Sequence, residues 1–307
     1  GHTVTVLDNL STGRDLNLEQ LKDNPRLSIR RADVSDHSDI RHHFEDVDWV
    51  FHLAALADVV PSIQRPLDYH RANVDGTASV LEAARLTGVK RFVYTASSSC
   101  YGIPDMYPTP ETAPARPQYP YALTKYVGEQ YVMHWARVYK LPCVSLRLFN
   151  VYGPRSRTSS SYGAVFGVFL KQKLEDKPLT VGDDGTQRRD FLYVTDVVQA
   201  FLKAAETSLT GEIWNLGSGN PQSVTHLVEL LGQDRVEIPT RPGEPEVTWA
   251  DISKISRDLD WKPTVSFEDG VAKIVEDIEY WRQAPLWDAD SIAEANKTWF
   301  DYLGDTR

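Results

Sequence analysis

A tyrosine and a lysine spaced by about one helical turn are well suited to acid–base chemistry. Tyr121 and Lys125 lie in the stretch Gln118-Tyr-Pro-Tyr-Ala-Leu-Thr-Lys-Tyr-Val-Gly-Glu-Gln130. Pro120 suits the first position of a helix, where its missing N–H leaves no hydrogen bond unmade. Residues four apart share one helix face, so the phenol and the ammonium group can reach the same ligand. We expect the lysine cation to favour phenolate and lower the pKa of Tyr121, which would allow proton exchange near neutral pH.

Chance is the alternative explanation for this pair. The chain has 14 tyrosines, so a tyrosine four residues before a lysine will often arise on a solvated helix face. The catalytic interpretation therefore depends on what the rest of the chain places around the pair.

The composition excludes several classes of function. The chain has 307 residues, 41% hydrophobic and 25% charged, which is typical of soluble globular proteins. Its net charge of −10 and the lack of a basic block argue against a nucleic-acid partner. No apolar run reaches the length of a membrane span, and no signal peptide is visible. Cys100 and Cys143 have no metal-type spacing, so we expect free thiols, a cytoplasmic protein and no metal site.

Strands and helices alternate through the first half of the chain. A helix is expected over 68–87 and a second one over the stretch that carries Tyr121. Strands are expected at 3–7, 27–33, 48–55, 91–95 and 143–149. This alternation predicts an α/β fold with a Rossmann-type, doubly wound parallel sheet. Ligands of such sheets bind at the carboxyl ends of the strands.

The second half has a different composition, with more glycine and more charged residues. Residues 1–150 are therefore predicted to form the nucleotide-binding domain. Residues 151–307 are predicted to form a smaller mixed α/β substrate domain over the ligand edge, with some segments crossing back. Its helices are expected near 194–206, 223–232, 251–259, 267–282 and 289–303.

One part of a dinucleotide fold is missing from the sequence. Such folds carry pyrophosphate on a glycine-rich loop, and an acid follows that loop by about 20 residues, at the end of the second strand. Asp8 fits the acid, yet no such loop precedes it. We therefore expect a gap in the sheet beside residues 3–7, where a further strand, loop and helix of roughly 25–30 residues would belong.

Nine short motifs occur in the order typical of one family. The chain resembles the extended short-chain dehydrogenase/reductases that act on nucleotide sugars, and among them the UDP-hexose 4-epimerases, over nearly its whole length. The motifs are L-D-N-L-S-T-G (7–13), A-D-V (32–34), F-H-L-A-A (51–55), N-V-D-G-T (73–77), S-S-S-C-Y-G (97–102), Y-x-x-x-K (121–125), R-L-F-N-V-Y-G-P (147–154), D-G-T-Q-R-R-D-F (184–191) and R-P-G-E (241–244).

The resemblance implies NAD as the cofactor. Asp8 can accept both hydrogen bonds of the adenosine ribose diol and would repel a 2′-phosphate, which favours NAD over NADP. Asp8 could equally be a turn residue, and Asn73 a helix N-cap. The implied cofactor-binding residues are Asp8, Asn9, Ser11, Thr12, Asp33, Val34, Leu53, Ala54, Ala55, Asn73, Tyr121, Lys125 and Phe149.

The same resemblance implies Ser97, Tyr121 and Lys125 as the catalytic residues. Ser97 lies four residues before Tyr101, as in the family; Ser98 is the fallback, and Ser99 is expected to point elsewhere. The three serines could instead satisfy backbone groups at a strand end.

Substrate contacts are carried over from the family in the same way. Arg189 and Arg241 resemble its pair of phosphate-binding arginines, although either could form a surface salt bridge. Thr248, seven residues after Arg241, resembles a gate beside carbon 2 of the sugar, where a small residue admits an N-acetyl group; it could instead merely pair in an edge strand. The implied substrate-binding residues are Ser97, Ser98, Asn150, Val165, Thr180, Arg189, Arg241 and Thr248.

The implied reaction is epimerisation at carbon 4 of a UDP-sugar through a transient 4-keto sugar. Related 4,6-dehydratases and uronate decarboxylases carry carboxylates that are absent between Ser97 and Gly102. A uronate epimerase, a 4-keto reductase and a catalytically silent NAD-binding sensor or scaffold remain alternatives. The family also implies a homodimer, in which the helix of Tyr121 and the one near 70–87 pair with their copies in a four-helix bundle. The outer stripe of the Tyr121 helix would be Tyr126, Val127, Gln130, Tyr131 and His134.

Overall fold

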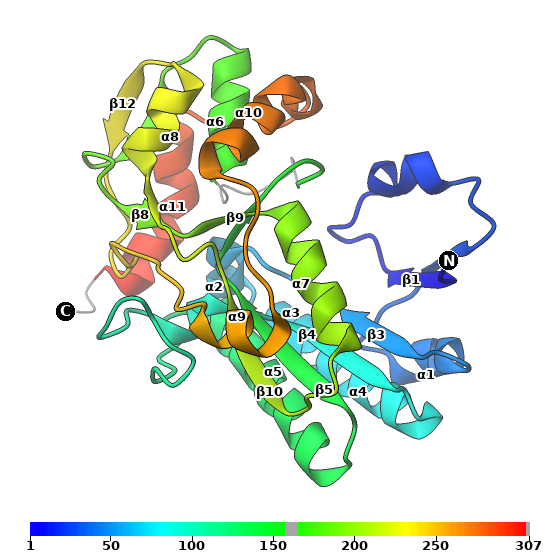
Figure 1. Ribbon diagram of the computed structural model, residues 1–307. Helices are drawn as coiled ribbons and strands as arrows, with labels where there is room; N and C mark the ends of the chain where they lie inside the picture. Colours follow the sequence, from blue (N-terminus) through cyan, green and yellow to red (C-terminus); the bar gives the residue numbers. More distant parts are fainter. Residues whose placement is uncertain (157–164, 305–307) are drawn as a thin grey trace.

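A four-stranded parallel sheet forms the centre of the computed structural model, which describes residues 1–156 and 165–304 (Figure 1). Its strand order is β10-β5-β4-β3, so β10, from the second half of the chain, pairs with β5. The α/β class and the parallel pairing that the sequence predicted are confirmed. The strands are β3 (Trp49–His52), β4 (Arg91–Ser97), β5 (Cys143–Leu148) and β10 (Glu212–Leu216).

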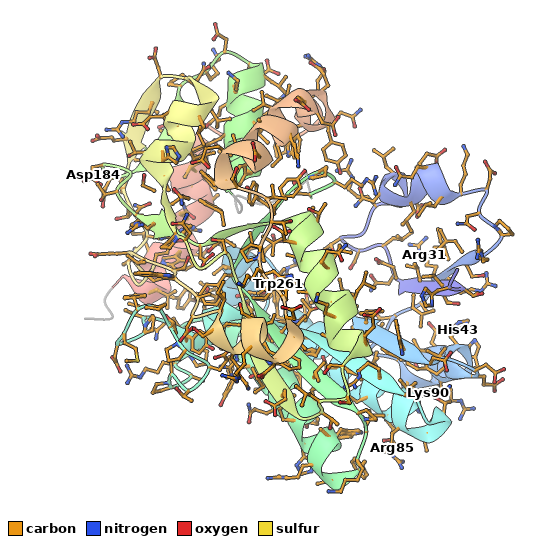
Figure 2. All side chains as sticks on the ribbon, in the orientation of Figure 1. Arg31, His43, Arg85, Lys90, Asp184 and Trp261 are labelled. Atoms are coloured by element: carbon orange, nitrogen blue, oxygen red, sulfur yellow. The ribbon has the colours of Figure 1, made fainter. Side chains whose placement is uncertain are left out.

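Helices cover both faces of this sheet. Alternate residues of β4 point to opposite sides, as in any strand: Phe92 and Tyr94 pack in one apolar cluster, and Val93 in another. The first cluster includes side chains of α4 (Gly76–Thr87) and α5 (Pro120–Val138). The second includes side chains of α7 (Val194–Glu206) and α9 (Ser253–Leu259), with Trp261 between them (Figure 2).

Helix α5 lies close against β4. It begins at Pro120 as predicted, with the proline in its first turn. The Tyr94 hydroxyl of β4 donates to the Lys125 carbonyl of α5 at 3.1 Å. A Cβ atom at Gly128 would overlap that hydroxyl, so glycine permits the close approach. The first turns of α5 are thus fixed beside the carboxyl end of β4.

Strands β1 (Val4–Asp8) and β2 (Leu27–Arg31) form a separate parallel pair. Within the described residues, no strand links this pair to β3. Leu7 and Val34 pack against the same apolar cluster as α4, which holds the pair to the body of the molecule. The further strand that the sequence analysis places beside 3–7 stays a prediction.

The rest of the second half forms a lobe beyond the carboxyl ends of the central strands (Figure 1). Its core is rich in aromatic rings, such as Phe166, Phe191 and Phe267. Its strands pair as β6 (Asn150–Tyr152) with β9 (Phe191–Tyr193), β7 (Leu179–Gly182) with β12 (Arg235–Ile238), and β8 (Arg188–Arg189) with β11 (Gln222–Ser223). Its helices are α6 (Val165–Leu174), α8 (Val224–Leu231), α10 (Phe267–Glu276) and α11 (Ala289–Leu303).

The remaining elements are short. They are η1 (Asp15–Leu21), α1 (His37–Ile40), η2 (Arg41–Phe44), α2 (Val59–Gln64), α3 (Pro66–His70), the π-helical turn η3 (Arg71–Asp75), η4 (Ser98–Tyr101) and η5 (Ile278–Trp281). None of the helices in the described part of the chain is long and apolar enough to cross a membrane.

Candidate active site

Ser97 and Tyr121 lie together because a strand end meets a helix start. Ser97 is the last residue of β4, and Tyr121 is the second residue of α5, which packs on that strand. The Ser97 hydroxyl lies close enough to the phenol to act on the pKa of Tyr121. The phenol and the serine hydroxyl can therefore both reach one oxygen atom of a ligand bound at this edge of the sheet.

Ser99 was expected to point elsewhere, and this expectation was wrong. The Ser99 hydroxyl lies 2.7 Å from the Ser97 hydroxyl, and the Ser99 N–H donates to the Ser97 oxygen at 3.2 Å. The tight turn η4, which Ser97 caps, folds residue 99 back over residue 97. Ser98 is the first residue of that turn and lies beside the pair in the chain.

Lys125 is buried directly behind Tyr121 on α5. Its side chain is 3% exposed, and its ammonium nitrogen lies 4.6 Å from the centre of the Tyr94 ring. Burial disfavours the charged form and lowers the pKa of Lys125 to about 7, against the opposing charge of Glu129. Lys125 can therefore change its charge close to neutral pH.

The expected lowering of the Tyr121 pKa was wrong for the ligand-free chain. Burial of the phenol raises the pKa of Tyr121, because the phenolate loses its hydration. The Ser97 hydroxyl acts in the opposite direction but does not prevail. The sequence spacing predicts a cation near the phenol. It does not show how strongly burial shifts the pKa values of the two groups.

Asn73 connects the end of β3 to the helix that carries Tyr121. Its amide oxygen accepts from the Leu56 N–H at 2.8 Å, and its amide nitrogen donates to the Leu56 carbonyl and the Thr124 hydroxyl, both at 3.0 Å. Leu53, Ala54 and Ala55 form the loop between β3 and this link. Asn73 therefore holds the loop after β3 and the start of α5 at a fixed separation.

The carboxyl ends of β1 and β2 suit the ribose end of a dinucleotide. Asp8 ends β1, and its carboxylate accepts from the Leu10 N–H at 2.7 Å. A Cβ atom at Gly13 would lie 2.5 Å from an Asp8 carboxylate oxygen, so a larger residue there would displace the Asp8 side chain from its present position. Hydrogen bonds from Ser35 hold the pKa of Asp33, just beyond β2, below its ordinary value. The Asp8 carboxylate suits the ribose diol of NAD, whereas the resemblance gives Asp33 and Val34 the adenine edge.

Other candidate cofactor residues lie near these strand ends. The Asn9 side chain accepts from the Ser11 N–H at 3.0 Å, so the loop after β1 is held in a tight turn. Thr12 follows in the same loop, and Val34 packs beneath it against the cluster that contains α4. Phe149 follows β5 and lies 6.5 Å, ring centre to ring centre, from Tyr101.

Asn150 and Thr248 are brought together from segments far apart in the chain. The Thr248 hydroxyl donates to the Asn150 side-chain oxygen at 2.8 Å and accepts from the Asp190 N–H at 3.0 Å. Asn150 begins β6, which leaves the central sheet after β5. The predicted gate residue therefore contacts Asn150, another of the predicted substrate-binding residues.

Arg189 and Arg241 converge on one carboxylate, that of Glu244. Arg241 forms an ion pair with Glu244, and the Arg189 guanidinium lies 3.9 Å from the second oxygen of the same group. Arg189 also donates to the carbonyls of Arg188 and Glu246 at 3.1 and 3.2 Å. Two guanidinium groups held this close together can bind the oxygens of a diphosphate.

Val165 and Thr180 are placed differently from the other candidates. Val165 begins α6, at the edge of the described residues. Thr180 lies in β7, where its side chain is buried and its hydroxyl accepts from Gln172 at 2.9 Å. The Thr180 side chain is thus turned into the core of the lobe, which leaves it no free surface for a ligand.

Three residues near the site were missed by the sequence analysis. The ring of Tyr119 lies parallel to that of Tyr121, with 6.4 Å between centres and 8° between planes. Glu244 joins the two arginines, and Trp299 contacts both Tyr119 and Arg241. Tyr119 could have been found from its place beside Tyr121. Trp299 gave no signal, because it is more than 50 residues from Arg241 in the sequence.

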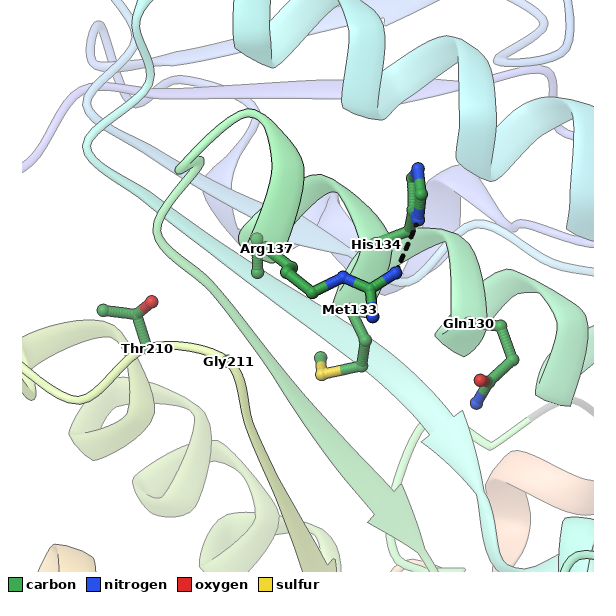
Figure 3. Close-up of a pocket in the computed structure, with 7 residues that line it drawn as sticks. Gln130, Met133, His134, Arg137, Thr210 and Gly211 are labelled. Carbon is green, nitrogen blue, oxygen red and sulfur yellow. Dashed lines mark hydrogen bonds between the residues drawn. The ribbon is translucent and has the colours of Figure 1, made fainter.

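A hollow of about 550 Å³ lies away from this site, on the outer side of α5 (Figure 3). It is lined by Gln130, Met133, His134, Ala136, Arg137, Thr210 and Gly211. Arg137 and His134 are hydrogen-bonded at its rim at 3.3 Å. Gln130 and His134 belong to the stripe expected to pair with a second copy. The homodimer stays a prediction.

Known proteins are similar to this chain over most of its length. Residues 1–217 match the model of the NAD dependent epimerase/dehydratase family. A UDP-glucose 4-epimerase from Mycolicibacterium smegmatis is 35% identical over 285 residues, which are 90% of this chain and 90% of that protein.

Solved structures give the same picture. A UDP-N-acetylglucosamine 4-epimerase from Methanobrevibacter ruminantium M1, in complex with UDP-N-acetylmuramic acid, has a TM-score of 0.85 at 32% identity and covers 89% of both chains. A UDP-glucose 4-epimerase from Thermotoga maritima, with UDP-glucose, has a TM-score of 0.84 at 33% identity and covers 92% of both chains. The chain therefore belongs to the NAD-dependent epimerase/dehydratase family, whose cofactor is NAD.

Proposed function

We propose that this protein interconverts the carbon-4 epimers of a UDP-sugar. The observation that carries the proposal is that Ser97 ends β4 where Tyr121 opens α5, with Lys125 one turn further along the same helix. NAD, when bound, supplies a reversible hydride acceptor at this edge. In its phenolate form, Tyr121 takes the proton of the carbon-4 hydroxyl and later returns it, while Ser97 hydrogen-bonds to the same oxygen. A charged Lys125, one turn further along α5, would favour this phenolate and so oppose the effect of burial on Tyr121.

The other candidates would hold the two ligands in place. Asp8 and Asp33 would face the adenosine end of NAD, and Asn73 would keep the start of α5 beside it. Arg189 and Arg241 would bind the substrate diphosphate, since their guanidinium groups already converge on a single anion, Glu244.

The serine turn favours epimerisation over elimination or decarboxylation. Its residues Ser98, Ser99 and Cys100 carry no carboxylate, and the Ser99 hydroxyl is paired with Ser97. A dehydratase or decarboxylase of the kind considered above would need a carboxylic acid here to move a second proton. A 4-keto reductase is disfavoured by Asp8, which would repel the 2′-phosphate of NADPH.

The test is to incubate the purified protein and NAD with UDP-glucose, UDP-N-acetylglucosamine and UDP-glucuronate, and to follow the sugars by NMR. We expect the carbon-4 epimer of at least one neutral hexose, with no net change in NAD. Conversion of the glucuronate alone would make the protein a uronate epimerase. Tight NAD binding with no conversion of any sugar would support a silent sensor or scaffold instead.

Thr248 is predicted to set the choice at carbon 2 of the sugar. Threonine is small, so N-acetylated sugars should be turned over at least comparably to UDP-glucose. Thr248→Tyr should fill that space and reduce kcat/KM for UDP-N-acetylglucosamine at least about tenfold relative to UDP-glucose. The measurement is the ratio of the two kcat/KM values.

The matched control separates bulk from hydrogen bonding. Thr248→Val keeps the volume but loses the hydroxyl that joins Asn150 and Asp190. It should lower kcat/KM for both sugars by a similar factor and leave their ratio unchanged. Equal losses for both sugars in Thr248→Tyr, or no loss in either, would show that Thr248 is not the gate.

A further inference from the structure

Trp299 of the C-terminal helix α11 touches two separate parts of the candidate site. The residue is 1% exposed, although it lies near the end of the described chain. Its ring centre is 5.5 Å from that of Tyr119, and the Arg241 guanidinium carbon lies 4.9 Å from the ring centre. Its indole N–H donates to the Pro242 carbonyl at 2.7 Å. One side chain therefore contacts the entry of the catalytic helix and the loop of a phosphate-binding arginine.

On the first side, the Tyr119 ring contacts both Trp299 and Tyr121, so the position of Trp299 affects that of Tyr121. Tyr119 caps the amino end of α5, and its ring lies parallel to the Tyr121 ring at 6.4 Å. The intervening Pro120 restricts the backbone between the two tyrosines. A shift of Tyr119 away from Trp299 would therefore move the first turn of α5, where the proposed catalytic phenol is attached.

On the second side, Trp299 contacts residues 241–247, here called the arginine loop. It contacts both the side chain of Arg241 and the backbone of Pro242. The indole face attracts the Arg241 guanidinium through its π electrons. The hydrogen bond to Pro242 fixes the backbone of the next residue. The ion pair of the same guanidinium with Glu244 lies within the loop and so does not by itself orient the loop relative to α5.

Helix α11 is itself anchored, so it can act as a rigid support. Asp288 and Ser291 form a reciprocal capping box at its amino end. Near its carboxyl end, the Thr298 hydroxyl accepts from Gln64 of α2 at 3.1 Å. The side chain next in sequence after Thr298 is Trp299, so this second anchor lies directly beside the contacts described above.

We propose that Trp299 is a positioning residue, which sets the catalytic tyrosine and the phosphate-binding arginine at a fixed relative distance. The proposal rests on the proposed function, because that function gives Tyr121 and Arg241 their roles. It predicts that Trp299 affects both turnover and nucleotide binding, whereas a tryptophan that only fills a core would affect neither.

The experiment compares Trp299→Leu with Trp261→Leu in the full chain. Trp261 is a matched control: it is 2% exposed, its indole N–H also donates to a backbone carbonyl, that of Asp196 at 3.1 Å, and it packs between α7 and α9 away from the site. Loss of the cation–π contact should weaken UDP binding roughly three- to thirtyfold in Trp299→Leu. A misplaced Tyr121 should lower kcat about ten- to hundredfold. Trp261→Leu should lower thermal stability and leave both values unchanged.

A second readout needs neither ligand nor activity. Hydrogen exchange of the ligand-free protein should become faster in Trp299→Leu at both 119–125 and 241–247, and in Trp261→Leu at neither. Trp299→Phe keeps an aromatic ring but loses the N–H that bonds to Pro242, so its exchange should become faster mainly at 241–247. This milder variant keeps the test open if Trp299→Leu does not fold.

The possible outcomes are distinct. If Trp299→Leu loses stability as Trp261→Leu does, but keeps its UDP affinity, kcat and exchange rates, Trp299 only fills the core and the proposal is wrong. Faster exchange of Trp299→Leu in only one of the two segments, or unchanged exchange of Trp299→Phe at 241–247, also overturns it. A wild-type protein that binds no UDP would count against the proposed function, and the exchange comparison would still decide the role of Trp299.

Discussion

Replacement of Tyr121 by phenylalanine is expected to reduce kcat about 10²–10⁴-fold, because it removes the group proposed to carry the proton of the carbon-4 hydroxyl. The phenylalanine ring keeps the parallel contact with Tyr119, so α5 should begin as it does in the natural chain. The affinities for NAD and UDP should change little, since neither the carboxylates near β1 nor the arginine pair is altered. The measurements are kcat by NMR and the two dissociation constants by calorimetry.

Tyr131→Phe provides the matched control on the same helix. Its side chain is 37% exposed on the outer side of α5 and touches none of the proposed catalytic groups. The variant should retain the kcat of the natural protein. If Tyr121→Phe also retained it, the proton would have to be carried by another group, of which the nearest is the Ser97–Ser99 hydroxyl pair.

The elements themselves were largely predictable from local sequence. The helix that starts at Pro120 and the strand that ends at Ser97 follow from a proline, from apolar runs and from serines that suit a turn. Strand β10 was missed, because its short run at 212–216 becomes a strand only by pairing with β5, which lies far earlier in the chain. Pairing of distant segments is a tertiary property that periodicity does not encode.

The residues of the site were predictable where they belong to motifs that are local in sequence. Motifs identified Tyr121 and Ser97, because each motif is local in sequence. The direction of the Tyr121 pKa was wrong, since burial depends on what the fold packs around the phenol. Glu244 and Trp299 became visible only when the arginine loop and helix α11 were brought together in space.

The largest effect on stability is expected for the buried ion pair beneath this site. Arg147 of β5 donates to both carboxylate oxygens of Glu129 on α5, with its shortest contact at 2.6 Å, and to the Tyr101 hydroxyl at 2.8 Å. The Arg147 and Glu129 side chains are 6% and 1% exposed. Arg147→Met should lower the free energy of unfolding by about 3–5 kcal/mol, because the buried Glu129 charge loses its ion-pair partner and keeps only the hydrogen bond from Ser145 at 3.0 Å and the more distant Lys125. Urea denaturation followed by tryptophan fluorescence would measure this change.

Two further variants show whether the unpaired charge is the cause. Arg116→Met removes an equally bidentate pair, with Asp105 at 2.8 Å, but that pair is exposed and its loss should change stability little. In the double variant Arg147→Met with Glu129→Gln the charge is gone as well, so part of the lost stability should return. If the double variant is no more stable than Arg147→Met alone, the loss must arise from the packing of the arginine and its bond to Tyr101. In that case the two charges would not contribute to the free energy of unfolding. The side chains would stabilise the fold only by filling the space between β5 and α5.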